Sequence, residues 1–480
     1  MNYPGAEFDQ QWQQLLAPSD YVNPVPQNRY HLIVVGAGPA GLIAAIGAAG
    51  LGAKVALVER HLMGGDCLNV GCVPSKSLLA FTERTAYPDF DKAFAWVREV
   101  RASIAPHDSV ERYTEAGVDV FLGEARFADD AELYVGDTRL QGRRIALCTG
   151  ASAALPPIPG LAESQPLTNE TVFELHKRPE SLAILGGGAI GCELALVFAR
   201  LGVRVNLYEL AARVLPLEIP DASAAVAEAL RAAGVRLNLG QRVDRIDAKT
   251  TVVAADASRS FDQILVALGR RPNTQTLNLA AAKVEVDAGG YIKVDAKLRT
   301  TNPRIFAAGD CTAGLQFTHH ADAQARALIQ NALFFPSQRV DGLVVPHCTY
   351  TAPEVAAVGL TPAQMTEAGT PYDVFRVELS ELDRVRASTA AKDAGFAEVY
   401  TVKNKDVILG ATVVAPEAGE LLSPIVLMMN RNLGLGTLRS AVFSYPTRSE
   451  FLKRIGDAYN RTRMTPTVAS LFKAWLRLIS

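Results

Sequence analysis

A glycine-rich turn between a buried strand and a helix occurs twice in this 480-residue chain, and no other feature limits its fold as strongly. In the first copy, an apolar strand at residues 30–35 leads through Gly36, Gly38 and Gly41 into an alanine-rich helix at residues 42–51. The first glycine permits a tight turn, the second lets the backbone approach a pyrophosphate, and the third lets the helix pack on the strand. The pattern therefore predicts a dinucleotide at the N-terminus of this helix.

An acidic residue completes each copy of the pattern. A strand at residues 54–58 is followed by Glu59, at the roughly 20-residue offset where a carboxylate accepts hydrogen bonds from a ribose diol. The second copy has strands at residues 181–185 and 204–208 and a helix at residues 192–201, with Gly186, Gly188, Gly191 and Glu209 in the corresponding positions. One such pattern is weak evidence, but two complete copies predict two dinucleotide-binding folds.

The surroundings of the two turns predict different cofactors. A pair of cysteines follows the first copy directly, which favours FAD as a tightly held flavin at that site. At the second site, Glu209 would repel a 2′-phosphate, and residues 210–212 offer no arginine to receive one. Arg213 is expected to lie too far along the loop. The second site is therefore expected to hold NAD(H) in preference to NADP(H).

The segment at residues 64–76 is the most specific in the chain. Its cysteines, Cys67 and Cys72, are close enough in sequence for a turn to hold them within bridging distance. Cys72 is expected at the N-terminus of a helix, where the partial positive charge favours a thiolate. Lys76 follows about one helical turn later, on the same face. The segment predicts a redox-active disulfide that takes electrons from a flavin.

Composition and the chain ends exclude several other classes of protein. The chain has 48 Lys and Arg against 50 Asp and Glu, without a block of like charges, so no nucleic-acid partner is expected. The first 20 residues lack the apolar core of a secretory signal, and no apolar run is long enough to span a membrane. We therefore expect a cytoplasmic location, where a close cysteine pair is more often catalytic than structural. The remaining cysteines are expected to be buried as small apolar side chains: Cys148, Cys192, Cys311 and Cys348.

The 64–76 segment resembles the active-site motif of the pyridine nucleotide–disulfide oxidoreductases, which include glutathione reductase, dihydrolipoamide dehydrogenase and mercuric reductase. Stretches at residues 146–150, 269–273, 305–310 and 349–359 resemble other parts of this family. The resemblance implies an α/β fold of the glutathione reductase type, with two Rossmann-like dinucleotide-binding domains and an α+β C-terminal dimerisation domain. The implied parts are an N-terminal arm (1–29), an FAD-binding domain (30–160 and 290–344), an NAD(H)-binding domain (161–289), a dimer-interface domain (345–462) and a C-terminal amphipathic helix (463–480).

The resemblance also implies roles for individual residues. Cys72 would be the charge-transfer thiol beside the flavin, and Cys67 the interchange thiol that meets the substrate. Lys76 would lie near flavin N5 and pair with Glu193, while Asp310 would bind the ribityl chain. The other residues implied to contact a cofactor are Gly65, Asp66, Gly150, Gly269, Gly309 and Thr318. The family further implies a homodimer whose active site is shared across the interface.

One position departs from the disulfide-reducing members of the family. They carry a His-Pro-Thr motif near the C-terminus whose histidine protonates the leaving thiol, whereas this chain has Tyr445 there and keeps the accompanying Glu450. The last histidine in the chain is His347. Tyrosine, with an ordinary pKa of about 10, is a poor proton shuttle at neutral pH. Efficient chemistry on dihydrolipoamide or glutathione is therefore not expected.

Mercuric reductase also has a tyrosine at this position, where it helps hold a soft metal ion near the cysteine pair. Cys67 and Cys72 would suit such an ion as transient ligands, although the chain has no cysteine after Cys348 to deliver it. Tyr445 could instead be a packing residue at the dimer interface. The sequence thus favours electron transfer from NADH through FAD and the disulfide to a soft metal ion or a small disulfide. The alternatives are a dihydrolipoamide dehydrogenase, and a redox sensor or membrane-recruited electron donor to a partner protein.

The two ends of the chain lie outside the resemblance. Residues 1–29 are expected to form a short helix and an extended arm on the folded body. Thr465 and Pro466 predict the start of a helix, because a capping residue and a proline in the first turn favour one. Its apolar residues recur at helical spacing, so this helix is expected either to pack against the dimer or to lie on a membrane surface.

Overall fold

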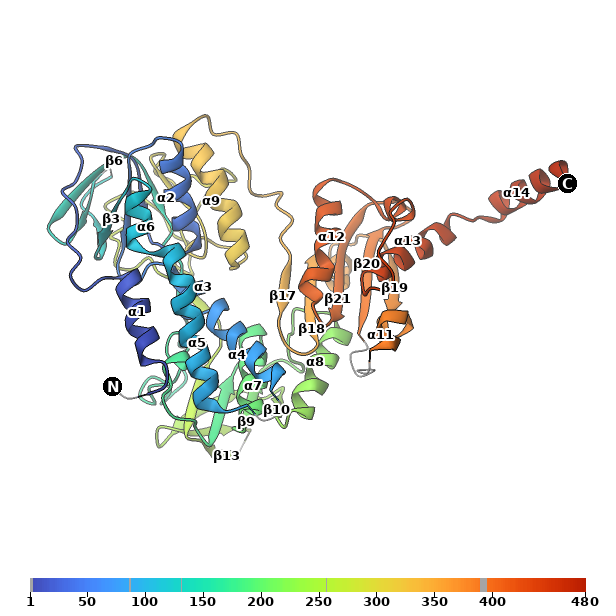
Figure 1. Cartoon of the computed structure of the whole chain (residues 1–480), viewed down its shortest axis with the longest axis horizontal. Helices are drawn as coiled ribbons and strands as arrows, with labels where there is room; N and C mark the ends of the chain where they lie inside the picture. The colour runs from blue at the N-terminus through green and yellow to red at the C-terminus, as the bar shows by residue number, and fades with distance from the viewer. Residues whose placement is uncertain (1–2, 86–87, 131, 256, 389–394) are drawn as a thin grey trace. The chain divides into compact units, whose positions relative to one another are not determined.

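The computed structural model of the chain describes residues 3–85, 88–130, 132–255, 257–388 and 395–480 (Figure 1). It divides into two compact units. The first unit comprises Met1–Leu210 and Gly234–Gly342, and the second comprises Ala211–Ala233 and Leu343–Ser480.

The first unit contains a mainly parallel sheet with the strand order β3-β2-β1-β6-β5-β4, to which β16 adds alongside β6. The strands are β1 (Tyr30–Val35), β2 (Val55–Glu59), β3 (Val118–Leu122), β4 (Ala125–Phe127), β5 (Glu132–Val135), β6 (Thr138–Leu147) and β16 (Ile305–Ala307). β1 runs parallel to both β2 and β6, whereas β4 and β5 form an antiparallel extension. Residues far apart in the sequence therefore share one nucleotide-binding sheet, as expected for a doubly wound fold.

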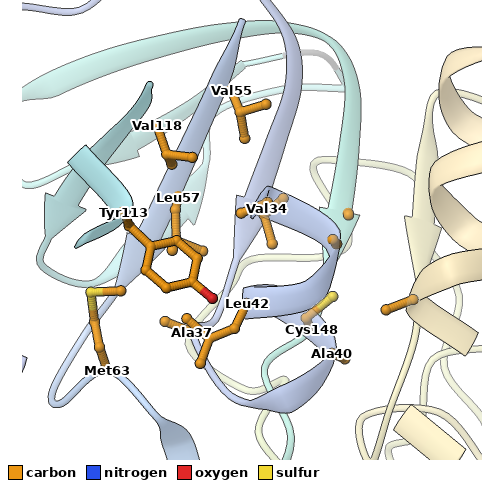
Figure 2. Close-up of a cluster of buried hydrophobic side chains, with 14 of the residues drawn as sticks. Val34, Ala37, Ala40, Leu42, Val55, Leu57, Met63, Tyr113, Val118 and Cys148 are labelled. Atoms are coloured by element: carbon orange, nitrogen blue, oxygen red, sulfur yellow. The ribbon is translucent and has the colours of Figure 1, made fainter. Parts of the chain in front are cut away.

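Helices cover this sheet, so its central strands are almost entirely apolar. Figure 2 shows Val34, Leu57 and Val118 from three neighbouring strands meeting Leu42 of α2 (Pro39–Gly50) and Tyr113 of α6 (Val110–Glu115). α9 (Thr318–Leu333) packs beside α2. This core fixes the glycine turn that joins β1 to α2.

The helix of each fingerprint begins earlier than the sequence analysis predicted. α2 begins at Pro39, inside the glycine turn, because a proline suits the first helical position and Gly38 is an extended N-cap. α7 (Ala189–Arg200) likewise starts inside its own turn, with Gly188 as N-cap. Gly41 and Gly191 therefore lie within the first turn of their helices, whereas Gly36 and Gly186 remain in the turn before them.

The second fingerprint belongs to a parallel sheet with the order β10-β9-β8-β14. Its strands are β8 (Ser181–Leu185), β9 (Arg204–Glu209), β10 (Arg236–Leu239) and β14 (Gln263–Val266), and an antiparallel group accompanies it: β11 (Val243–Asp247), β12 (Thr251–Ala254) and β13 (Ala257–Ser260). β7 (Ala151–Ala153) and β15 (Arg270–Pro272) pair separately. Both Rossmann-like folds expected from the sequence are present.

The second unit is an α+β fold around an antiparallel sheet with the order β17-β18-β21-β20-β19. Its elements are β17 (His347–Thr349), β18 (Glu354–Gly359), β19 (Tyr372–Glu378), β20 (Phe396–Val402), β21 (Ile408–Ala415), α8 (Pro220–Ala232), α10 (Pro362–Glu367), α11 (Asp383–Ala387), α12 (Ala418–Asn430) and α13 (Glu450–Thr462). Two contacts of 2.6 Å join the segment that carries α8 to the sheet of this unit: Glu218 contacts His347 of β17, and Asp221 contacts Arg376 of β19.

The four cysteines outside the 64–76 segment do not all match the expectation. Cys148, Cys192 and Cys311 are buried, as predicted. Cys348 is only half-buried, so that expectation was wrong. The reason is that Cys348 lies on β17, an edge strand of its sheet, where one side remains open.

The two ends of the chain behave differently. α1 (Ala6–Leu16) buries Trp12 and Leu16 in the core of the first unit, and the following arm runs along β3, where the Tyr21 hydroxyl donates to the Val120 carbonyl at 2.9 Å. None of the described residues of α14 (Pro466–Ile479) is buried. No helix in the described ranges is long and apolar enough to cross a membrane.

Candidate active site

The two cysteines of the 64–76 segment lie at the ends of a tight loop. Cys67 belongs to α3 (Gly65–Asn69), and Cys72 is the first residue of α4 (Cys72–Arg84). The two side chains are hydrogen-bonded to each other, and each shifts the pKa of the other.

The two thiols have very different pKa values. The hydrogen bond from Cys67 lowers the pKa of Cys72 to about 6, the charge of Lys76 acts in the same direction, and burial opposes both. The same hydrogen bond, together with burial, raises the pKa of Cys67. At neutral pH the proton therefore stays on Cys67, and Cys72 carries the thiolate at the helix N-terminus.

This arrangement predicts an acidic titration of one thiol. In the reduced protein, alkylation of Cys72 by iodoacetamide is expected to accelerate as pH rises through about 6, because the thiolate is the nucleophile. Mass spectrometry of the labelled peptide over pH 4 to 10 measures the rate at each cysteine. A midpoint near the ordinary cysteine pKa of about 8.5 would contradict the assigned thiolate.

Lys76 and Glu193 form an ion pair close to the cysteines. The Lys76 Nζ lies 2.7 Å from Glu193 Oε2, which joins α4 to α7, the helix of the second fingerprint. Glu193 is almost completely buried. Thr318, the first residue of α9, places its hydroxyl 3.8 Å from the Cys72 sulfur. Helices from three separate parts of the sequence thus converge on the thiolate.

The first glycine turn has the geometry that a bound pyrophosphate requires. Gly36 has φ of +102°, and a Cβ there would collide with the carbonyl of Cys148. A Cβ on Gly41 would collide with the Gly36 carbonyl, so the helix can approach the strand only with glycine at this position. Glu59 accepts a hydrogen bond from the Ala37 amide at 2.7 Å, which fixes the carboxylate beside the turn.

A cavity opens next to this turn. It is lined by Gly36, Glu59, Arg60, Thr149 and Asn273, among others. The Thr149 hydroxyl is buried at this cavity, beside the Cys311 thiol. A glycine cradle, a fixed carboxylate and a buried hydroxyl around one cavity fit the adenosine end of FAD.

Asp66 and Asp310 meet through a residue that the sequence analysis did not assign to the site. Arg270 forms ion pairs with both, with its Nε 3.6 Å from Asp310 Oδ2. Burial raises the pKa of Asp310.

Two glycines of the expected flavin site are fixed by backbone hydrogen bonds. The Gly309 amide donates to the Gln324 side-chain oxygen at 2.7 Å, and the Gly150 carbonyl accepts from the Asn273 amide at 3.0 Å. These polar groups fit the linker between the flavin ring and the adenosine.

The second glycine turn repeats the first. Gly186 and Gly191 cannot carry a Cβ, for the same reasons as Gly36 and Gly41, while Gly188 has open space around it. Glu209 accepts from the Gly187 amide at 2.6 Å, as Glu59 does from Ala37. Gly269 has φ of +112° and directly precedes Arg270. A second dinucleotide fits here by the same chemistry.

Tyr445 and Glu450 belong to the second unit. Tyr445 is 69% exposed, and its hydroxyl donates to Asp383 at 2.8 Å. This hydrogen bond raises the pKa of Tyr445 above its ordinary value. Glu450 pairs with Arg454 at 3.2 Å, and its second carboxylate oxygen is buried without a hydrogen-bond partner among the described residues.

The fold and the family match together define a flavin-dependent oxidoreductase. Residues 30–325 match the model of the family "Pyridine nucleotide-disulphide oxidoreductase", and residues 345–455 match its dimerisation domain. The chain belongs to this family, whose members are FAD-dependent and bind NAD(P).

Individual proteins that resemble the chain include mercuric reductases, dihydrolipoyl dehydrogenases and a flavoprotein disulfide reductase. The chain is 35% identical to a mercuric reductase from Bacillus cereus, over 88% of this chain and 70% of that protein. It is 33% identical to a dihydrolipoyl dehydrogenase from Chlamydia muridarum, over 88% of this chain and 95% of the relative. Among solved structures, the Cu(II) complex of the HOCl-induced flavoprotein disulfide reductase RclA from Escherichia coli matches with a TM-score of 0.82 and 29% identity, over 90% of this chain and all of that one. The expected family, fold class and homodimerisation domain are therefore confirmed.

Proposed function

We propose that the enzyme passes electrons from NADH through FAD to the Cys67–Cys72 pair and on to a soft metal ion, as a mercuric-reductase-like protein. FAD, when bound, supplies the group that accepts a hydride from the nicotinamide and passes two electrons on. The chain then receives these electrons by cleavage of the Cys67–Cys72 bond, which leaves a thiolate on Cys72 and a proton on Cys67. Lys76 stabilises the thiolate by its charge.

Oxidation of the dithiol completes the cycle. Two thiolates are suitable ligands for a soft cation. Once Cys67 loses its proton to solvent, the pair forms the disulfide again and donates two electrons, both to one Hg(II) ion or one to each of two Cu(II) ions. A small disulfide is the other candidate substrate, but its reduction needs an acid to protonate the departing thiolate.

The preference for a metal ion over a disulfide as substrate rests on the hydrogen bond and the protonation of the Tyr445 hydroxyl. Its hydroxyl is engaged by Asp383, and its pKa is raised, so it holds its proton at neutral pH more firmly than a free tyrosine. Glu450, which would orient a histidine, is paired with Arg454 instead. We propose that the partner subunit's Tyr445 and the partner subunit's Glu450 complete the site in the homodimer without acid–base chemistry.

A substrate panel tests this function. NADH consumption by the purified FAD-loaded protein is measured with Hg(II), Cu(II), lipoamide and oxidised glutathione. Metal-dependent turnover well above the disulfide-dependent rates is expected. Turnover of lipoamide at the rate of a true dihydrolipoamide dehydrogenase would overturn the proposal in favour of that second candidate.

Restoring the missing acid should change the substrate. Tyr445→His is expected to raise lipoamide-dependent turnover by about tenfold to a hundredfold, because general acid catalysis contributes roughly that much or more. Tyr445→Phe is the matched control and should leave lipoamide turnover at its low starting level. An unchanged lipoamide rate in Tyr445→His would show that the tyrosine only packs at this position.

For the nicotinamide, we propose NADH rather than NADPH. The Glu209 carboxylate beside the second turn would repel a 2′-phosphate. The Arg213 guanidinium is not available to bind a 2′-phosphate, because it donates to the carbonyls of Pro216 at 2.9 Å and Glu218 at 3.1 Å. We also propose a cytoplasmic location for the protein.

We further propose that α14 docks on an anionic membrane surface from the cytoplasmic side. Its apolar side chains Leu471, Phe472 and Trp475 are each more than half exposed. After Asp457 the chain has no acidic residue but four cations: Arg461, Arg463, Lys473 and Arg477. An apolar face with aromatic residues and a cationic opposite face is typical of helices that lie in a membrane interface.

Deletion of residues 465–480 separates this proposal from packing on the dimer. The full chain should sediment with vesicles containing phosphatidylglycerol, and the truncated chain should not, while both remain dimers with equal NADH oxidase activity. A control with neutral phosphatidylcholine vesicles should show weaker binding, since the cations contribute about 1 kcal/mol each near an anionic surface. Dissociation of the truncated protein into monomers would instead place α14 on the partner subunit.

A further inference from the structure

The N-terminal helix reaches the redox loop, which we define as residues 63–72. Residues 3–16, here called the N-terminal clamp, precede the part of the chain that matches the family model at 30–325. The clamp comprises α1 and the turn before it. The clamp therefore lies outside the part of the chain that the family model covers.

The first contact joins two buried side chains. The indole Nε1 of Trp12 donates to the side-chain oxygen of Asn69 at 2.9 Å. The amide nitrogen of Asn69 in turn donates to the Met63 carbonyl at 3.0 Å. Trp12 is 6% exposed and Asn69 5%, so water cannot replace a lost partner without entering the core. Asn69 is the last residue of α3, the short helix that carries Cys67.

The second contact runs through a completely buried arginine, Arg101. Arg101 of α5 (Phe90–Ile104) donates to the Asn69 carbonyl and to Asp9 of α1, each at 3.1 Å. Its guanidinium also lies over the Trp12 ring, 4.4 Å from the centroid. Arg101 therefore links the backbone of the redox loop to both clamp residues.

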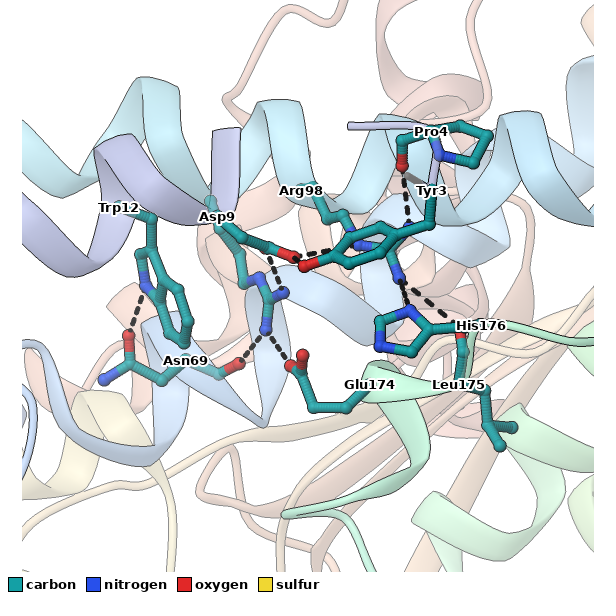
Figure 3. Close-up of polar contacts among 10 residues, drawn as sticks. Tyr3, Pro4, Asp9, Trp12, Asn69, Arg98, Glu174, Leu175 and His176 are labelled. Carbon is teal, nitrogen blue, oxygen red and sulfur yellow. Dashed lines mark hydrogen bonds and ion pairs between the residues drawn. The ribbon is translucent and has the colours of Figure 1, made fainter. Parts of the chain in front are cut away.

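Further bonds hold the clamp itself in place. Asp9 also accepts from Arg98 at 3.1 Å and from the Tyr3 hydroxyl at 2.9 Å. Figure 3 shows Arg98 reaching from α5 to Pro4, Leu175 and His176, with Tyr3 stacked on the histidine ring. At the other end of α1, the Met63 amide donates to the Leu16 carbonyl at 3.3 Å. The clamp is thus anchored on both sides of its contact with Asn69.

We propose that Trp12 and Asp9 are positioning residues of the redox centre: acting through Asn69, they hold Cys67 against Cys72 and so favour formation of the disulfide. A disulfide forms only within a narrow range of separations and dihedral angles. A loop that is fixed at Asn69 presents the Cys67 sulfur to Cys72 at a high effective concentration. The inference rests on the proposed function only in taking this pair as the redox centre.

The test uses a substitution that removes one hydrogen and keeps the ring. Trp12→Phe retains an aromatic side chain beneath Arg101 but leaves the Asn69 side-chain oxygen without its donor. The FAD-loaded protein is equilibrated with reduced and oxidised dithiothreitol, whose own disulfide exchanges two electrons and two protons with the Cys67–Cys72 pair. Quenching with an alkylating agent then gives the ratio of disulfide to dithiol.

The equilibrium constant for disulfide formation is expected to fall by about fivefold to tenfold in Trp12→Phe, as for other buried hydrogen bonds that lose one partner. The charge-transfer absorbance of the reduced enzyme should weaken in parallel, a change that lower stability alone would not cause. Trp96→Phe is the matched control, because Trp96 lies on α5 and is 36% exposed. Its constant should stay within about twofold of the wild type.

A double-mutant cycle guards against a general folding effect. If Trp12 acts through Asn69, Trp12→Phe should cause no further decrease in an Asn69→Ala background. An unchanged constant in Trp12→Phe, or additive losses in the double variant, would overturn the clamp while leaving the proposed function intact. A wild-type protein that forms no Cys67–Cys72 disulfide at any dithiothreitol ratio would overturn the proposed function and the clamp with it.

Discussion

Cys67→Ala is expected to lower NADH-dependent reduction of the external acceptor by at least about a thousandfold, the scale of loss seen when a catalytic nucleophile is removed. The reason is that Cys72 alone can neither form the intramolecular disulfide nor provide the second thiolate for a soft metal. The NADH-dependent loss of flavin absorbance should remain, since neither glycine turn is altered. Stopped-flow absorbance and steady-state turnover separate the two steps.

The matched control is another cysteine outside the site. Cys348→Ala removes a half-buried thiol of the second unit and should leave turnover within about twofold, because surface changes of this kind are usually mild. Metal reduction that survives in Cys67→Ala would mean that electrons leave the flavin directly. The proposed path through the disulfide would then be wrong.

Arg101→Met is expected to destabilise the first unit by about 3 kcal/mol, because removal of one partner from a buried ionic network leaves charge that its surroundings no longer balance. Arg101 is 0% exposed and contacts Asp9, Glu174 and the Asn69 carbonyl. Methionine fills part of the volume but makes none of these bonds. The apparent midpoint of urea unfolding, followed by tryptophan fluorescence, measures the effect.

An exposed arginine of the same unit provides the comparison. Arg204 is 77% exposed and lies 4.0 Å from Glu180, which is 82% exposed. Arg204→Met should change stability by less than about 1 kcal/mol, the usual limit for a surface ion pair. Equal decreases in the free energy of unfolding in the two variants would show that the ionic network around Asp9 stabilises the protein no more than a surface ion pair does.

Local patterns in the sequence were sufficient to predict the nucleotide folds. Gly36 and Gly41 each serve a turn made by residues close in the chain, so the fingerprint can be recognised without knowing the fold. The exact helix starts were missed because the proline at position 39 can begin a helix inside the turn. Cys348 was misjudged because the sequence does not reveal which strand lies at the edge of a sheet.

Parts of the site that depend on distant residues could not be predicted from spacing. Arg270 lies 204 positions from Asp66, and Arg101 lies 92 positions from Asp9. Neither arginine has a local pattern that marks it as buried, since arginine is ordinarily a surface residue. The pairing of Lys76 with Glu193 was expected only because the motif resembles a known family. Spacing alone would have left Glu193 as an ordinary helix residue.

Counting thiols before and after NADH shows whether electrons reach the Cys67–Cys72 pair. Purified, FAD-loaded protein is mixed anaerobically with a small excess of NADH, quenched with an alkylating agent, and analysed by mass spectrometry for each cysteine. We expect Cys67 and Cys72 both to become alkylated after NADH and to be protected before it, while the labelling of Cys348 stays constant. Equal labelling of Cys67 and Cys72 with and without NADH would contradict it.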